Sequence, residues 1–171
     1  KETYDTLFLT GLRIGELCAL RWCDLDLEHK KLSVRGSFST ASRKVTSPKT
    51  KTSIRTIDLP NRLVEELKQR YERKKKLDGF NDLYYVFGDI AVTWPGTFRY
   101  RFNNDLKNVD VKHITIHGFR HSHASYLLSN PMISESLVAE RLGHSIDMLR
   151  STYAHIYEKR RTALVEYIEK L

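Results

Sequence analysis

Four histidines and one arginine fall within the thirteen residues HITIHGFRHSHAS, which run from 113 to 125. His117 and Arg120 are three residues apart in what we expect to be the first turn of a helix, so their side chains share one face. The N-terminus of a helix favours an anion, and an arginine adds a planar, two-pronged donor for it. We therefore interpret His117 and Arg120 as groups that hold a phosphate.

A metal site is the alternative interpretation of the same stretch. His117 and His121 have the four-residue spacing of a helical metal site, which usually includes a nearby carboxylate. The sequence has no Asp or Glu between Asp110 and Glu135, and Arg120 would repel a cation. The metal interpretation is therefore the weaker one. The other histidines are expected to cap backbone groups or to face solvent: His113, His121 and His123.

Two further stretches carry reactive side chains. In TGLRIGELCALRW, Arg13 precedes Glu16 by three residues at the start of a predicted helix. In RLGHSIDMLRSTYAH, His144 follows Gly143, and Tyr153 comes nine residues later. Taken singly, these residues have structural explanations: an intrahelical ion pair for the first stretch and a half-buried aromatic residue for the second. Their combination is what points to chemistry.

The composition indicates a polyanionic partner. The 171 residues include 29 Lys and Arg against 21 Asp and Glu, which gives a net charge of +8 and suggests nucleic acid. A membrane surface would require a basic amphipathic helix or a lipid signal, and the sequence offers neither clearly. We expect Cys18 and Cys23 to be reduced thiols in or near the core of a cytosolic protein. Because the chain starts with Lys1 inside a helical pattern, we also expect it to be part of a longer protein.

The elements that must position these residues are mostly helices. Gly11 separates two predicted helices, and KLSVR alternates so that Leu32 and Val34 share one face of a strand, with a returning strand over residues 54–59. Ser134 and Gly143 are typical of a helix start and a helix end. The sequence predicts one mostly helical α+β domain with a small antiparallel sheet near its N-terminal part. The predicted later helices cover 61–79, a segment after Pro95, 117–129, 134–142, 145–154 and 157–170.

Five motifs in order resemble the catalytic domain of the tyrosine recombinases, the phage integrase family. They are TGLRIGELCALRW, SPKTKTSIRTIDLP, HGFRHSHAS, RLGHS and STYAHI, and together they span nearly the whole chain. The chain is similar in particular to integrases of conjugative transposons and phages of Gram-positive bacteria. Each motif is a modest signal alone, and the order and the gaps make the set specific.

The resemblance implies an enzyme that cleaves and rejoins DNA strands through a 3′-phosphotyrosyl intermediate. Tyr153 would be the nucleophile; its ionisation at pH 7 costs about 4 kcal/mol, so a nearby base or cation must assist it. Tyr157, one turn later, is the weaker candidate. The implied roles are a base at His117, donors to the phosphate at Arg13, Arg120 and His144, and an acid for the 5′-oxygen at Lys49, with Lys51 as its alternative.

The resemblance also assigns supporting residues and partners. Glu16 would hold Arg13 or a histidine in place, and the DNA backbone would be contacted by Lys44, Lys51 and Arg55. The implied partners are double-stranded DNA and other recombinase protomers, with no metal, cofactor, ATP, membrane or small-molecule substrate. Residues 1–171 would form the catalytic domain of a bacterial cytoplasmic protein, with residues 157–171 as a tail helix that packs on its own core or on a neighbouring protomer. Core-binding and arm-binding domains would lie upstream.

Two other classes of function stay open on sequence alone. A basic DNA-binding module or regulator with the same fold would need phosphate contacts but no aligned tyrosine. A metal-dependent phosphodiesterase would use the histidines as ligands and would be inhibited by chelators. Topoisomerases share the tyrosine chemistry, although the local motifs resemble those of integrases more.

Overall fold

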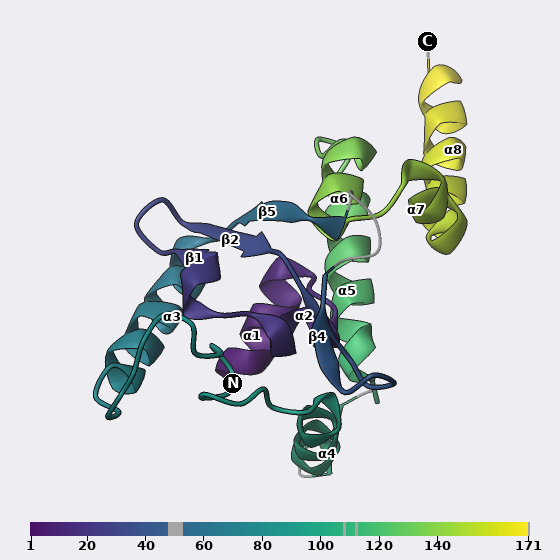
Figure 1. Cartoon of the computed structure of the whole chain (residues 1–171). Coiled ribbons are helices and arrows are strands. Elements are labelled where there is room, and N and C mark those ends of the chain that lie inside the picture. Colours follow the sequence, from purple (N-terminus) through teal and green to yellow (C-terminus); the bar gives the residue numbers. More distant parts are fainter. Residues whose placement is uncertain (48–52, 108, 112, 171) are drawn as a thin grey trace.

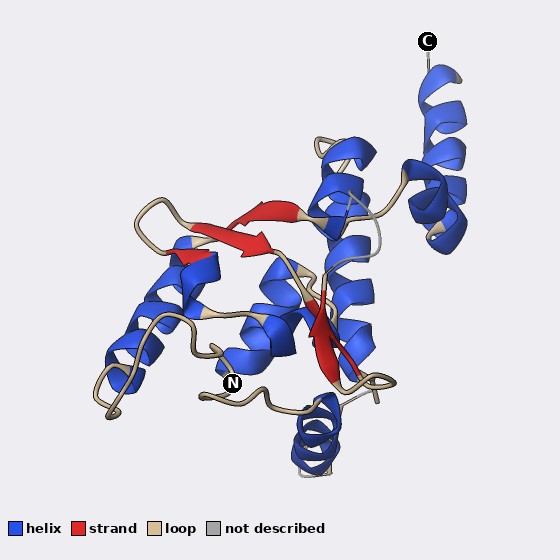
Figure 2. Cartoon of the chain, viewed as in Figure 1, coloured by secondary structure: helices blue, strands red, loops and turns tan. Residues whose placement is uncertain are grey.

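The computed structural model describes residues 1–47, 53–107, 109–111 and 113–170. Helices surround two small antiparallel sheets that come from the first third of the chain (Figures 1 and 2). The predicted α+β class with a small sheet near the N-terminus is therefore confirmed. Within the described residues, no helix combines the length and the apolar character needed to cross a membrane.

A sharp turn at Gly11 joins the first two helices, as predicted. Helix α1 (Glu2–Thr10) ends at Gly11, whose φ of 68° is left-handed, and α2 (Ile14–Ala19) follows. A Cβ atom at Gly11 would lie 2.6 Å from Cδ2 of His123, closer than carbon atoms can approach. The position therefore requires glycine both for its backbone angle and for its close contact.

The larger sheet has the strand order β1-β2-β5 and is antiparallel throughout. It consists of β1 (Leu25–Asp26), β2 (Lys31–Val34) and β5 (Arg55–Asp58), and β1 follows a short 3₁₀ helix, η1 (Trp22–Asp24). Leu32 pairs with Ile57, and both are buried, so the predicted facing of the two strands is confirmed. A second, two-stranded sheet that the sequence did not predict pairs β3 (Ser37–Ser39) with β4 (Lys44–Thr46).

The remaining helices are found close to their predicted positions. They are α3 (Asn61–Lys74), α4 (Pro95–Leu106), α5 (Ile116–Ser129), α6 (Glu135–Leu142), α7 (Ile146–Thr152) and α8 (Ala154–Ile168). The largest differences from the predicted boundaries are that α3 ends at Lys74, α7 ends at Thr152, and the last helix begins at Ala154. The last two differ because Tyr153 has φ −114° and ψ 30°, which breaks the helix at this residue.

Side-chain caps fix the start of α5, which carries His117 and Arg120, and the start of α6, which precedes His144. Thr115 accepts a hydrogen bond from the Gly118 backbone N–H at the start of α5, and Ser134 accepts one from Leu137 at the start of α6. Helix α6 ends at Gly143 with φ 66°. The predicted roles of Ser134 and Gly143 are confirmed.

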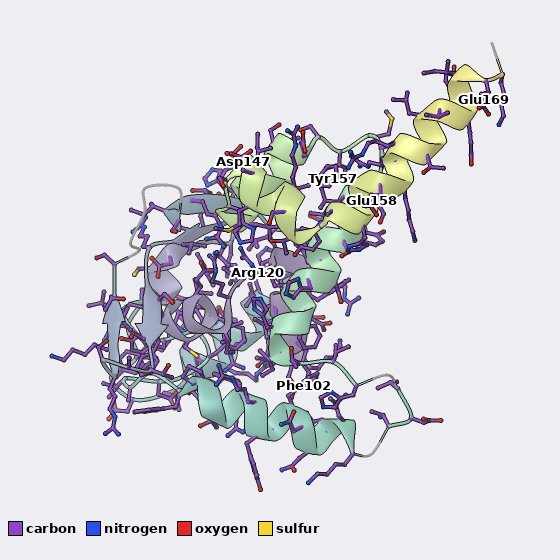
Figure 3. The ribbon with its side chains drawn as sticks, turned by 90° about the vertical axis from the view of Figure 1, so that its right-hand side faces the viewer. Phe102, Arg120, Asp147, Tyr157, Glu158 and Glu169 are labelled. Carbon is purple, nitrogen blue, oxygen red and sulfur yellow. The ribbon has the colours of Figure 1, made fainter. Side chains whose placement is uncertain are left out.

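Two hydrophobic clusters divide the molecule. The larger one lies between α1, α2, α3, α4 and the three-stranded sheet, and the smaller one lies among α5, α6, α7 and the first turn of α8. Helix α8 then extends away from the rest of the chain in two perpendicular views (Figures 1 and 3). Both cysteines are free; Cys18 is buried as expected, whereas Cys23 is exposed, so its predicted place near the core is wrong.

Candidate active site

Arg120 is buried between the two hydrophobic clusters. It points inward from the N-terminal half of α5 (Figure 3), and only 2% of it is exposed. Its Nη1 donates to the carbonyl oxygen of Gly11 at 2.7 Å, and its Nη2 donates to that of Leu142 at 2.7 Å. These carbonyls terminate α1 and α6, where the helix dipole is negative. The guanidinium is thus fixed in place before any ligand arrives.

His144 contacts the same guanidinium. Arg120 Nη2 lies 2.8 Å from His144 Nε2, and because an arginine can only donate, Nε2 must accept. Burial, followed by the charges of Arg120, Arg13 and Arg55, lowers the pKa of His144 to about 4. His144 is therefore neutral at pH 7, with its proton on Nδ1. For Nε2 to donate to a phosphate, as expected from the sequence, it would have to leave Arg120.

Arg13 and Glu16 form the contact that their spacing predicts. Arg13 Nη1 donates to Glu16 Oε1 at 2.9 Å, and the Arg13 backbone N–H donates to Oε2 at 2.8 Å. The Arg13 side chain is 36% exposed, whereas that of Glu16 is 4% exposed. Arg13 thus presents its guanidinium at the surface, close enough to Arg120 for its charge to lower the pKa of Arg120 after the larger effect of burial.

Arg55 is placed differently from the sequence expectation. It was expected to contact the DNA backbone, but its side chain is 3% exposed and its Nη2 donates to Glu16 Oε2 at 2.9 Å. Its Nη1 donates to Oε1 at 3.1 Å, and its Nε donates to the carbonyl oxygen of Arg141 at 2.7 Å. The expectation is wrong because Glu16 and a backbone carbonyl already occupy this guanidinium.

The carboxyl group of Glu16, which contacts both Arg55 and Arg13, stays ionised. Burial alone would raise the pKa of the Glu16 carboxyl, but hydrogen bonds from Arg55 and Arg13 outweigh burial and hold that pKa below its usual value. The carboxylate therefore connects the strand β5 to the surface guanidinium of Arg13. A change in either arginine would be felt by the other through this one side chain.

His117 lies in the first turn of α5 and is exposed. Partial desolvation of its ring, followed by the charges of His121, Arg120 and Arg13, lowers its pKa. Its ring meets that of His121 edge to face, with the centroids 4.7 Å apart. His117 is thus a neutral imidazole at pH 7, in the same cationic region as Arg120.

Tyr153 belongs to the smaller hydrophobic cluster and is only 2% exposed. Its hydroxyl lies 3.2 Å from His121 Nδ1. Burial raises the pKa of this hydroxyl, and the charge of Arg120 acts in the opposite direction. The phenol therefore lies next to an imidazole and within the field of the buried guanidinium.

Tyr157, the weaker candidate nucleophile, has the opposite electrostatic environment. Burial and the neighbouring Glu135 carboxylate raise its pKa to about 12. A carboxylate opposes formation of a phenolate, whereas the arginine near Tyr153 favours it. The surroundings therefore favour Tyr153 as the residue that could ionise.

The expected lysines divide into a described and an undescribed group. Lys44 lies at the start of β4 and is exposed, as a residue that contacts the DNA backbone would be. Lys49 and Lys51 lie outside the described residues, so their roles stay predictions. Among the described residues, no three His, Cys, Asp or Glu side chains gather as a possible metal site.

Two histidines have neighbours that sequence reasoning missed. His121 is exposed, as expected, but its Nδ1 also lies 3.2 Å from the Tyr153 hydroxyl, a contact that the sequence did not predict. His123 is buried and accepts a hydrogen bond from Arg141 Nε at 3.1 Å. Arg141 also donates to the carbonyl oxygens of Leu9 and Asp58, which ties α6 to α1 and to β5.

The profile of the phage integrase family matches residues 3–160 of the chain. Over its full length, the chain is 31% identical to the ICEBs1 integrase of Bacillus subtilis strain 168 and covers 49% of that protein. It is 30% identical to the integrase of Staphylococcus phage L54a, with 95% of this chain and 49% of the relative covered. The chain thus spans about half the length of the curated relatives it matches.

The fold is also that of solved integrases and recombinases. A structure of the Tn1549 transposon integrase in complex with circular intermediate DNA matches 98% of this chain and 59% of that one, with a TM-score of 0.71 and 24% identity. The XerA recombinase matches 92% of this chain and 56% of its own, with a TM-score of 0.68 and 24% identity. The chain belongs to the phage integrase family.

Proposed function

We propose that the chain is the catalytic domain of a site-specific DNA recombinase that cleaves and rejoins strands through a 3′-phosphotyrosyl intermediate. The observation that carries this proposal is the arrangement around α5: the buried guanidinium of Arg120 contacts His144, and the Tyr153 hydroxyl contacts His121, the next residue of the same helix. Those groups suit a reaction in which a phenolic oxygen attacks a phosphodiester and negative charge builds on its non-bridging oxygens.

The cleavage step is a transesterification. The Tyr153 oxygen forms a bond to phosphorus, the bond from phosphorus to the 5′-oxygen breaks, and the departing 5′-oxygen takes up a proton. The hydroxyl loses its own proton to an imidazole, a role that the sequence assigned to His117. The proton for the 5′-oxygen is assigned to Lys49. Attack by a different 5′-hydroxyl reverses the step, so the bond energy stays in the protein link and neither ATP nor a metal enters the reaction.

Arg13 and Arg120 divide the work on the phosphate. Three of the five N–H donors of Arg120 engage Gly11, Leu142 and His144, and the other two, which have no hydrogen-bond partner among the described residues, could bind a phosphate oxygen. Arg13, partly exposed and held through Glu16, reaches the phosphate from the surface. His144 joins them as a donor once Nε2 leaves Arg120 and the ring proton moves from Nδ1 to Nε2.

The partners follow from the same proposal. Double-stranded DNA is the substrate, and the Tn1549 relative has been solved with DNA of a circular intermediate. Other copies of the recombinase complete the assembly, in the bacterial cytoplasm. Residues 161–170, at the end of α8 and just beyond it, are exposed, including the apolar Leu164, Val165 and Ile168, and this suits a tail that docks on a neighbouring protomer.

Capture of a covalent adduct tests the proposed function. The gene product that carries this chain is incubated with a randomised pool of nicked duplexes, in which loss of a short 5′-fragment traps the cleaved state. Sequencing of the attached DNA identifies the cleaved site, and mass mapping identifies the modified residue. We expect an adduct on Tyr153 that persists in EDTA, is abolished in Tyr153→Phe and is retained in the matched control Tyr157→Phe.

Three results would contradict the proposal. DNA binding without any adduct would favour the basic binding module. An adduct that survives in Tyr153→Phe would move the nucleophile to another residue. Cleavage that EDTA abolishes would favour a metal-dependent phosphodiesterase.

A further inference from the structure

The imidazole that contacts the nucleophile is His121, not His117. His121 Nδ1 lies 3.2 Å from the Tyr153 hydroxyl, and the two ring centroids are 5.8 Å apart. His117 instead contacts His121, and the two imidazole rings meet edge to face. We infer that His121 is a further catalytic residue, whose Nδ1 takes the proton of Tyr153 during cleavage and returns it during rejoining. This inference rests on the function proposed above.

Helix geometry places His121 for this role. His117 and His121 are four residues apart on α5, so they occupy one face of the helix, whereas Arg120 turns inward. Tyr153 comes from the break between α7 and α8 and brings its hydroxyl to that same face. His121 is therefore the meeting point between the helix that holds the phosphate donors and the segment that holds the nucleophile.

The state of the ring follows from the contact. For Nδ1 to accept the hydroxyl proton, the neutral ring must carry its own proton on Nε2. Among the residues that the structure describes, the titratable groups in ring or hydrogen-bond contact with His121 are His117 from α5 and Tyr153 from the α7–α8 break. Neither is a carboxylate, so no fixed negative charge competes for the proton.

Solvent access also distinguishes the two imidazoles. His121 is exposed, so water can stabilise the positive charge that its ring acquires on taking the proton. His117 bears a lowered pKa, with Arg120 and Arg13 among its causes, and is better suited to remain neutral beside the phosphate. The two rings then share the work: His121 moves the proton, and His117 contacts the phosphate side of the site.

The complete step balances. The O–H bond of Tyr153 breaks as its proton passes to His121 Nδ1, and the oxygen forms its bond to phosphorus. The bond from phosphorus to the 5′-oxygen breaks, and that oxygen takes a proton from the acid assigned to Lys49. In rejoining, the tyrosine oxygen is the leaving group, and the imidazolium of His121 gives the proton back.

His121→Asn is the informative substitution. The Asn side-chain oxygen can accept a hydrogen bond near the position of Nδ1, so the variant keeps the contact with Tyr153 but cannot take up a proton. Single-turnover cleavage of the site found in the adduct experiment is measured from pH 6 to 10, with His113→Asn as the matched control on an exposed histidine. We expect His121→Asn to cleave about 100-fold more slowly at pH 7, and the control to match the wild type.

The pH profile separates catalysis from structure. If His121 is the base, the deficit of His121→Asn shrinks as the pH rises towards 10, because hydroxide then removes the tyrosine proton. A deficit that stays constant with pH would mean a purely structural role and would overturn the inference. Cleavage within 3-fold of wild type at pH 7 would overturn it equally. Unchanged DNA binding and thermal unfolding show that the variant is folded.

A substrate with sulfur in place of the bridging 5′-oxygen gives a second readout. Its thiolate leaves without a proton, so the substrate restores cleavage to a variant that lacks the acid, such as Lys49→Ala. It should not restore cleavage to His121→Asn, because the tyrosine proton must still be removed. Restoration by sulfur would place His121 on the acid side and would contradict the inference. The proposed function is judged separately, by the wild-type adduct and its loss in Tyr153→Phe.

Discussion

The groups proposed to bind the phosphate and the segment that carries the proposed nucleophile are held in different ways. Arg120, Glu16 and Arg55 are all buried. Arg120 donates to two backbone carbonyls, and Arg55 donates to the carboxylate of Glu16. Tyr153 lies at a helix break, in the smaller of the two hydrophobic clusters, next to a helix that extends away from the body (Figure 1). The proposed phosphate donors are thus held by several hydrogen bonds, whereas the proposed nucleophile is held mainly by the packing of the smaller hydrophobic cluster.

The largest effect is expected from Arg120→Lys. A lysine cannot donate to Gly11 and Leu142 at once and still present a planar pair of donors to a phosphate. Cleavage should fall by about 100- to 1,000-fold in single-turnover assays. Arg62→Lys, on an exposed residue of α3, is the control and should leave the rate unchanged. A rate near wild type for Arg120→Lys would show that prior fixation of this guanidinium is unimportant.

Glu16→Gln tests the buried pair. The substitution leaves the charge of Arg55 buried without its carboxylate, and this should lower the free energy of unfolding by about 3–5 kcal/mol in urea titrations. The pKa of Glu16 is lowered in the folded chain, so its contribution exists above the ordinary carboxyl pKa and is lost as the pH falls. The variant should lack this part of the acid sensitivity. Stability equal to wild type would mean that Arg55 finds other support.

His123 should give the folded chain a second pH dependence. Burial, followed by the charge of Arg141, lowers its pKa from 6.5 to about 4. Between these values the unfolded chain binds a proton that the folded chain does not, so the free energy of unfolding falls as the pH falls. The loss should reach roughly 3 kcal/mol at pH 4. His123→Gln should remove it, whereas His113→Gln should retain it; identical curves for all three proteins would contradict the prediction.

The smallest effect is expected from removal of the exposed part of α8. Truncation after Arg161 should change the free energy of unfolding by less than about 0.5 kcal/mol, because residues 161–170 are exposed. Ile156→Ala, within the part of α8 that packs on α5, should cost about 2–4 kcal/mol. Equal losses in urea unfolding would mean that the whole helix supports the fold. The same truncation, assayed for multi-protomer complexes on DNA, tests docking in trans.

Local signals explain what the sequence predicted well. Gly11, Ser134 and Gly143 act through backbone angles and caps that involve only their neighbours, and the structure confirms them. The motif residues Arg120 and His144 are in hydrogen-bond contact even though they come from different parts of the chain. Their assignment depended on the family resemblance, because helical spacing alone gave each a structural explanation.

The residues that sequence reasoning misplaced depend on distant partners. Arg55 was expected to contact DNA; it has the same parity as Ile57 and Leu59, a signal for an inward side chain that was not used, and its carboxylate partner lies 39 residues earlier. His121 was noticed only for its spacing from His117, because its contact, Tyr153, lies 32 residues further on. Neither pairing can be derived from a local pattern, since each forms only when separate elements pack together.

The two carbonyls that hold Arg120 belong to the ends of two helices, α1 and α6, that contribute to different hydrophobic clusters. Gly11 ends a helix of the larger cluster, and Leu142 belongs to the smaller cluster. The Arg120 guanidinium therefore links the two hydrophobic clusters by hydrogen bonds. If warming separated the two hydrophobic clusters, Arg120 would lose its hydrogen bond to Gly11 or to Leu142 while the helices stayed folded. Enzyme inactivation should then come at a lower temperature than the melting of helical structure.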